Sequence, residues 1–146
     1  MCQRDTSAYL MPNYPRKLLV DAGPLIALYK STDKYHERAV AFSKACAAIL
    51  HTTLPVLTEA AHFLDDAGKL AMLKTVQREA VLLVDLSHAD FDRLARVIEK
   101  FPGADLADAS LVIAAERLDI TDIVTVDRTD FGRYRTKSGR GFVNHF

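Results

Sequence analysis

The chain has 146 residues, of which 49% are hydrophobic and 26% are charged. This length fits one ordinary domain, and the composition suffices for a hydrophobic core and excludes disorder throughout. Lysine plus arginine total 19 and aspartate plus glutamate total 19, so the formal net charge is zero. That balance excludes a histone-like basic protein and an acidic tail.

The start of the chain is polar and contains prolines, so we expect residues 1–16 to be a flexible N-terminal extension and residues 17–146 to be a single domain. These first residues lack the apolar region of a signal peptide, and no apolar run approaches the roughly 18 residues of a membrane helix. A cytoplasmic protein is expected. Cys2 and Cys46 are too few for a disulfide framework, and Cys46 is expected to be a small buried residue.

Short apolar runs alternate with amphipathic stretches along the chain. The runs predicted as strands are residues 17–20, 49–52, 81–84 and 123–126, with a short last strand at 142–145. After a turn at 22–24, helices are predicted from Leu25, over 33–48, from Pro55 to Gly68, and over 69–79, 88–101 and 105–118. Fully apolar strands separated by helices are typical of a three-layer α/β sandwich, with a central parallel sheet flanked by helices.

An aspartate directly follows the first and the fourth predicted strands. Asp21 follows residues 17–20, and Asp127 follows residues 123–126. Ligands of open parallel sheets bind at the carboxyl ends of the strands, where both residues are expected. Aspartate is also a common turn residue at the surface, which explains either residue alone but explains the pair less well.

Two predicted helices carry acids in apolar surroundings. Glu59 lies in the first turn after Pro55, and Asp108 lies among alanines with Asp105 three residues before it on the same face. The helix dipole favours acids in a first turn, but it explains poorly an aspartate on a helix fit for burial. Acids from four segments would repel one another unless a cation neutralised them, and hard oxygen ligands suit Mg²⁺ or Mn²⁺. Such a metal can activate water for attack on a phosphodiester.

Four blocks of the sequence resemble the signature blocks of PIN domains, and the VapC-like ribonuclease toxins of bacterial toxin–antitoxin pairs are similar in pattern. The blocks are LLVDAGPLIAL, LTEAAHFL, DLADASLVIAAERL and IVTVDRTDF, and their order and spacing match from about residue 17 to residue 132. Many relatives have Thr or Ser directly after the first aspartate, where this chain has Ala22, and the seventeen residues before the first block form a longer lead than is usual for such a toxin.

The resemblance implies a PIN-like fold and a metal-dependent endoribonuclease that uses Mg²⁺ or Mn²⁺. The acidic quartet carried over from the motifs is Asp21, Glu59, Asp108 and Asp127. The implied metal ligands are Asp21, Asp108, Asp127 and, as an additional acid, Asp105, with Thr125 as a hydroxyl that supports the site. The implied partners are an RNA substrate, a cognate antitoxin and a second copy of the chain in a homodimer.

A basic segment follows the last of these acids. Within thirteen residues it contains one acid, Asp130, and five cations: Arg128, Arg133, Arg135, Lys137 and Arg140. RNA phosphates require such countercharge, so these residues are candidates for RNA binding, although a solvated tail would have the same composition. Phe131 and Tyr134 are candidates for stacking on bases, with a core position as the simpler interpretation for Phe131.

Two other functions fit part of the pattern. A phosphoacceptor receiver domain also carries acids at the ends of parallel strands, but it needs a second acid beside Asp21 and a lysine beside Asp127, and both are missing. A non-catalytic PIN-like module that binds RNA or protein would share every feature described above, so it remains the alternative to the nuclease.

Overall fold

The structure is a computed structural model that describes residues 15–146. Most of the expected N-terminal extension, with Cys2, therefore lies outside the described residues. Cys46 is buried, as expected. Among the helices of the described part, none is long and apolar enough to cross a membrane.

Within residues 15–146, five strands form one sheet, and every neighbouring pair is parallel. The strand order is β3-β2-β1-β4-β5. The strands are β1 (Lys17–Val20), β2 (Ile49–Thr52), β3 (Val81–Leu83), β4 (Asp122–Val124) and β5 (Val143–Asn144). The predicted parallel sheet is confirmed.

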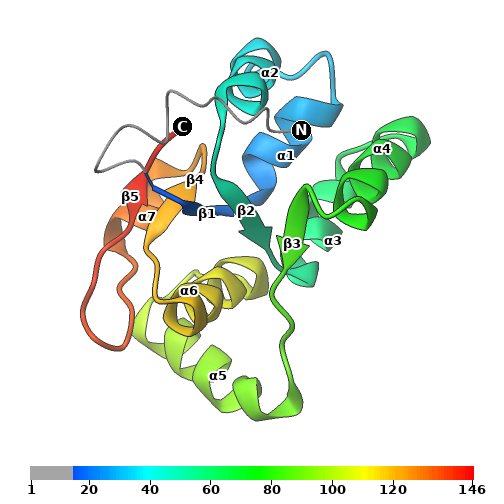
Figure 1. Ribbon diagram of the computed structural model, residues 1–146. Coiled ribbons are helices and arrows are strands. Elements are labelled where there is room, and N and C mark those ends of the chain that lie inside the picture. The colour runs from blue at the N-terminus through cyan, green and yellow to red at the C-terminus, as the bar shows by residue number, and fades with distance from the viewer. Residues whose placement is uncertain (1–14) are drawn as a thin grey trace.

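The helices cover both faces of this sheet. Helices α1 (Ala22–Tyr29) and α2 (His36–Ala45) connect β1 to β2, and α3 (Leu54–His62) and α4 (Asp66–Gln77) connect β2 to β3. A short 3₁₀ turn, η2 (His88–Asp90), precedes α5 (Phe91–Lys100) and α6 (Leu106–Leu118), and α7 (Arg128–Arg133) follows β4. Figure 1 shows α2 above the sheet and α5 and α6 below it. The predicted three-layer sandwich is confirmed.

The direction in which the chain crosses the sheet changes between β1 and β4. From β1 the chain moves outward through β2 to β3, and it then returns to β4 on the other side of β1. Because crossovers are right-handed, this reversal sends α2 to one face of the sheet and α5 and α6 to the other. Val20 pairs with Val124, and the Asp21 N–H donates to the Val124 carbonyl at 3.0 Å. The segments that follow β1 and β4 therefore start side by side, where parallel sheets bind their ligands.

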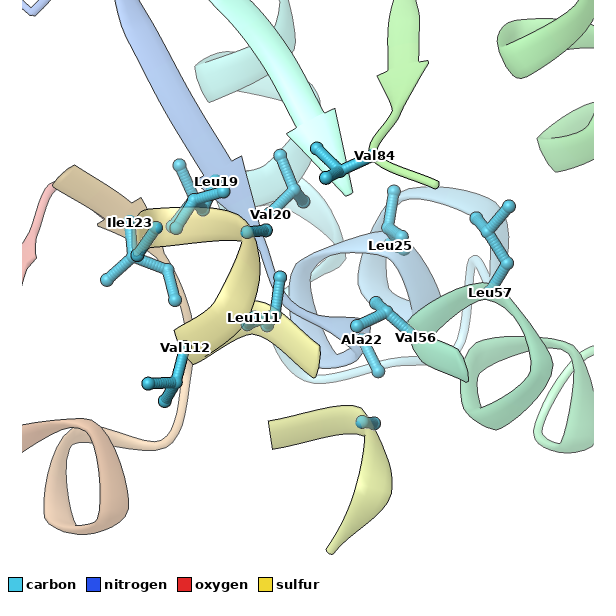
Figure 2. Packing of buried hydrophobic residues seen from close by; sticks show 14 of the residues in the cluster. Leu19, Val20, Ala22, Leu25, Val56, Leu57, Val84, Leu111, Val112 and Ile123 are labelled. Carbon is cyan, nitrogen blue, oxygen red and sulfur yellow. The ribbon is translucent and has the colours of Figure 1, made fainter. Parts of the chain in front are cut away.

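Helix α6 is the most deeply buried helix of the described chain, because apolar residues surround it on nearly every side. Its residues 109–115 are all buried. Figure 2 shows Leu111 and Val112 of α6 in the same cluster as Val20 of β1 and Ile123 of β4. Burying a side chain of this size contributes about 1.5–3 kcal/mol, so α6 and its Asp108 are firmly positioned relative to the sheet.

Two of the helix predictions have wrong boundaries, because side chains that accept hydrogen bonds from the backbone begin helices there. Residues 22–24 are not a turn but the first turn of α1, which Asp21 caps. The helix predicted from Pro55 to Gly68 is two helices. Asp65 starts the second by accepting from the Gly68 N–H at 2.8 Å, so Gly68 lies inside α4 and terminates nothing.

The fourth strand ends at Val124 and not at Val126. The Asn144 side chain accepts from the Thr125 N–H and donates to the Thr125 carbonyl, both at 3.1 Å, so residue 125 bonds to a side chain where a strand would bond to backbone. The chain then turns toward Asp127, which caps α7.

Candidate active site

Asp21 lies at the carboxyl end of β1 with 6% of its surface exposed. Its carboxylate accepts from the Ala22 N–H at 2.8 Å and from the Thr125 hydroxyl at 2.8 Å. Burial raises the pKa of Asp21 to about 6, against the lowering effect of these two hydrogen bonds, and the nearby charges of Glu59 and Asp127 raise it further. A buried acid without a cation beside it is costly, which suggests that a positive charge belongs here.

Asp127 lies beside Asp21 and is tied to it through Thr125. The Thr125 hydroxyl that donates to Asp21 also accepts from the Asp127 N–H at 3.0 Å. The Asp127 carboxylate caps α7 by accepting from the Asp130 N–H at 2.9 Å. Partial burial and the neighbouring Asp130 raise the pKa of Asp127. The structure thus places Thr125, predicted as a supporting hydroxyl, between the two acids that follow β1 and β4.

Asp108 comes from the first turn of α6 and is half-buried. Its pKa is raised to about 7, chiefly by burial and also by the charges of Asp105, Asp21 and Asp130. The Tyr134 hydroxyl donates to Asp108 Oδ2 at 2.5 Å, which lowers that pKa. Tyr134 is fully buried, so this contact fixes the carboxylate from inside the protein.

Glu59 reaches the same cluster from α3. It is half-buried, and burial together with Asp105 and Asp108 raises its pKa. Asp105 is exposed at the N-terminus of α6, where it caps the helix by accepting from the Asp108 N–H at 2.8 Å. Helices α3 and α6 are held together beneath these acids by a buried hydrogen bond of 2.6 Å between the hydroxyls of Thr53 and Ser110.

The four acids predicted from separate segments therefore influence one another's charge at one end of the sheet, and Asp105 belongs to the same cluster. Two contributors were missed from the sequence. Asp130 raises the pKa values of both Asp108 and Asp127, and its spacing of three residues from Asp127 is the available sequence signal. The contact of Tyr134 with Asp108 has no sequence signal, since 26 residues separate them.

The donor chemistry of this cluster fits Mg²⁺ or Mn²⁺, because carboxylate oxygens are the ligands these cations prefer. The raised pKa values of Asp21 and Asp108 show that their charges lack compensation. The cluster is not a closed ligand group, however. Among residues 15–146, no three His, Cys, Asp or Glu side chains are arranged as a group that could hold a metal ion.

Most of the predicted RNA-binding cations of the basic segment contact the protein itself. Arg133 pairs with Asp130 at 3.0 Å, Arg140 pairs with Asp119 at 2.8 Å, and Arg135 donates to two backbone carbonyls. Lys137 lies near Glu116, which accepts from the Lys137 backbone N–H. Arg128, in contrast, is exposed at the start of α7 next to Asp127.

The two aromatic residues of the basic segment are both in the core. Phe131 is 2% exposed, which confirms its core position. The prediction that Tyr134 stacks on bases is wrong, because its ring is enclosed between Phe101 and Phe131, with centroids at 5.4 and 5.1 Å.

The comparisons with known proteins bear on the fold. The sequence matches no protein-family model and no curated protein. The structure resembles the crystal structure of Mycobacterium tuberculosis VapC20, described as a sarcin–ricin loop cleaving toxin, with a TM-score of 0.71 and 14% sequence identity. The match covers 77% of this chain and 92% of that one. The PIN-like fold expected from the four sequence blocks is thereby confirmed as a VapC-like PIN fold.

Proposed function

We propose that the protein is a metal-dependent endoribonuclease that cleaves RNA phosphodiester bonds. The observation that carries this proposal is the convergence of four acids, from β1, α3, α6 and the loop after β4, at the end of the sheet where parallel folds bind ligands. Their raised pKa values support it, because a divalent cation would offset the burial and the mutual repulsion that raise them.

In this proposal Asp21, Asp108 and Asp127, with Asp105, hold Mg²⁺ or Mn²⁺. A cation held by these residues would supply a nucleophilic water and would stabilise negative charge on the phosphate under attack. Glu59 accepts a proton from the attacking water, a role suited to a carboxylate whose pKa is raised toward neutrality. The Thr125 hydroxyl orients Asp21.

The fold shared with VapC20 supports a role as the toxin of a toxin–antitoxin pair. A toxin of this kind has RNA as its substrate and an antitoxin protein as its inhibitor, and we extend both to this chain. A homodimer and a cytoplasmic location belong to the same proposal. A short antitoxin-like reading frame beside the gene would support it.

The test is cleavage of RNA by purified protein with Mg²⁺ or Mn²⁺. We expect the wild type to cleave, EDTA to stop cleavage, and Asp108→Asn to reduce the rate at least a hundredfold. Asp92→Asn is the matched control, because Asp92 is exposed on α5 and, within residues 15–146, forms an ion pair with Arg96 alone, at 2.9 Å; it should cleave like the wild type.

Equal cleavage by the wild type and Asp108→Asn would contradict the proposed site. Binding of RNA without cleavage under either metal would favour the alternative, a non-catalytic PIN-like binding module.

A further inference from the structure

A cavity of about 430 Å³ opens beside Asp127, on the side of the sheet edge that faces α2. Tyr35 and Arg38, at the start of α2, line one part of it, and Arg128 and Thr129, at the start of α7, line another. The ring of Phe146 also contributes. Segments separated by some ninety residues in the sequence therefore enclose one space directly next to the acidic cluster. Its volume is in the range of sites that bind small organic molecules.

Two cations line this cavity, Arg38 and Arg128, and neither pairs with an aspartate or glutamate side chain within residues 15–146. Arg38 donates to the backbone oxygen of Phe146, the last residue of the printed sequence, and its guanidinium lies 4.7 Å from the centroid of the Phe146 ring. Arg128 has no side-chain hydrogen bond or ion pair to the described residues. Lys34 does not line the cavity, but its Nζ lies 5.0 Å from the centroid of the Tyr35 ring.

These positive charges offset the repulsion that the acidic cluster exerts on a polyanion such as RNA. A polyanion is repelled by carboxylates, so a site that cleaves one requires positive charge close to them. Arginine suits this purpose, since its planar guanidinium donates two parallel hydrogen bonds to phosphate oxygens. Arg133 and Arg140 are already paired with acids, Asp130 and Asp119. The cations beside Asp127 that remain to bind a phosphate are Arg38 and Arg128.

The cavity also offers an aromatic surface for a base. Tyr35 is half-buried and packs edge-on against Phe146, with ring centroids 6.4 Å apart. Stacking of a base on such a ring is worth about 1–3 kcal/mol and works with any base. Single-stranded RNA presents unstacked bases and phosphates at the spacing of one nucleotide, so it can use the arginines and the ring together.

We infer that this cavity is a nucleotide subsite for single-stranded RNA, in which Arg38 and Arg128 bind a phosphate next to the one that is cleaved and Tyr35 stacks on its base. The inference rests on the proposed function and names how that site holds its substrate. It assigns binding to α2, a part of the chain outside the sequence motifs.

The test is binding of a fluorescently labelled single-stranded RNA, measured by anisotropy in EDTA so that no cleavage occurs. We expect Arg38→Gln and Arg128→Gln each to weaken binding about tenfold and to reduce the salt dependence by about one phosphate contact. Tyr35→Leu should weaken binding with the salt dependence unchanged. Arg78→Gln is the matched control, since Arg78 is exposed at the end of α4 and far from the cavity along the sheet; its binding should equal that of the wild type.

The Arg38→Lys variant tests whether the effect of Arg38→Gln is purely structural, because lysine keeps the positive charge but lacks the two parallel N–H donors of the guanidinium. Its binding should lie between that of the wild type and Arg38→Gln, with the same thermal unfolding midpoint. If Arg38→Gln and Arg128→Gln bind RNA as the control does, the subsite is wrong, even where the wild type cleaves RNA. If both weaken binding but the wild type cleaves nothing, the subsite stands and the nuclease proposal fails.

Discussion

Two hydroxyl groups determine how the acids of the cluster are held. Thr125 donates to Asp21, and Tyr134 donates to Asp108. The PIN-domain pattern that this sequence resembles often has a hydroxyl directly after the first aspartate, and this chain has Ala22 there. The loss is offset, because Asp21 still accepts two hydrogen bonds, from the Ala22 backbone N–H and from Thr125. The departure from the family pattern therefore does not leave Asp21 unsupported.

Replacing Tyr134 with Phe should slow cleavage about tenfold, the kinetic equivalent of one lost hydrogen bond of about 1.4 kcal/mol. The hydroxyl lowers the pKa of Asp108, so its removal should move the acidic limb of the rate–pH profile to higher pH. The measurement is single-turnover cleavage from pH 5.5 to 8.5.

Tyr29→Phe removes the same atom far from the site, where it bonds to Thr75, and serves as the control. A profile that stays unchanged in Tyr134→Phe while stability falls would assign Tyr134 a purely structural role.

At the level of the elements, the apolar runs were sufficient to predict the strands and the parallel sheet, because continuous burial on both faces leaves a clear pattern. Helix boundaries were harder, because single side chains decide them. Asp21, Asp65, Asp105 and Asp127 each accept from a backbone N–H within three residues and start a helix. Three of these four caps are also predicted site residues, so the acids both begin the helices and form the cluster.

The parts of the site that escaped prediction depend on contacts between distant segments. The four acids were found because each stands out from its own neighbours in the sequence. Tyr134 and Arg38 have unremarkable neighbours, and their roles arise only when the fold brings α7 to α6 and α2 to Asp127. The ion pairs of the basic segment could not be predicted for the same reason, since composition does not show that Arg133 and Arg140 already have carboxylate partners.

The close packing of α1 against the loop after β4 predicts that a larger residue at position 23 disturbs both elements. A Cβ added at Gly23 would lie 2.3 Å from Val126 Cγ2, too close for any real contact. Gly23→Ala should therefore displace Val126 and the adjacent Asp127, lower the free energy of unfolding by about 1–3 kcal/mol, and reduce cleavage.

Urea denaturation and cleavage rates measure both effects. The double variant Gly23→Ala with Val126→Ala removes the obstructing methyl and should recover much of the stability and activity. Gly132→Ala is the control, since its added Cβ would have no atom within 4 Å. If the losses of stability and activity from the two substitutions simply add in the double variant, the clash between residue 23 and Val126 is not their cause.

For the molecule as a whole, the net charge of zero results from opposite local arrangements. Away from the site, several charges are paired; for example, Arg93 binds Glu116 and Arg117 binds Asp90, each at 2.6 Å. At the carboxyl end of the sheet, Asp21 and Asp108 have no cationic partner among the described residues and repel each other. The protein thus keeps an uncompensated negative charge in one place, at a cost in stability that a bound cation would remove.

This cost should be measurable as a dependence of stability on pH. The pKa of Asp21 is 3.8 in the ordinary state and about 6 in the folded protein, so folding favours its protonated form. The contribution of Asp21 to the free energy of unfolding is therefore fully present below pH 3.8 and is lost as the pH rises through about 6. In EDTA, Asp21→Asn should therefore match the wild type near pH 4 and exceed it by roughly 1–3 kcal/mol at pH 8, because one pKa unit corresponds to about 1.4 kcal/mol.

Adding Mn²⁺ at pH 8 should make the wild type more stable than Asp21→Asn, the reverse of the order expected in EDTA. Ligand binding to the folded state stabilises it in proportion to the logarithm of ligand concentration over Kd, and Asp21→Asn lacks one of the proposed ligands. Thermal unfolding followed by circular dichroism, at several Mn²⁺ concentrations, measures this, with Asp92→Asn as the control for loss of an acid elsewhere. If Mn²⁺ stabilises Asp21→Asn as much as the wild type, the acids hold no metal, and their repulsion must be relieved by protons alone.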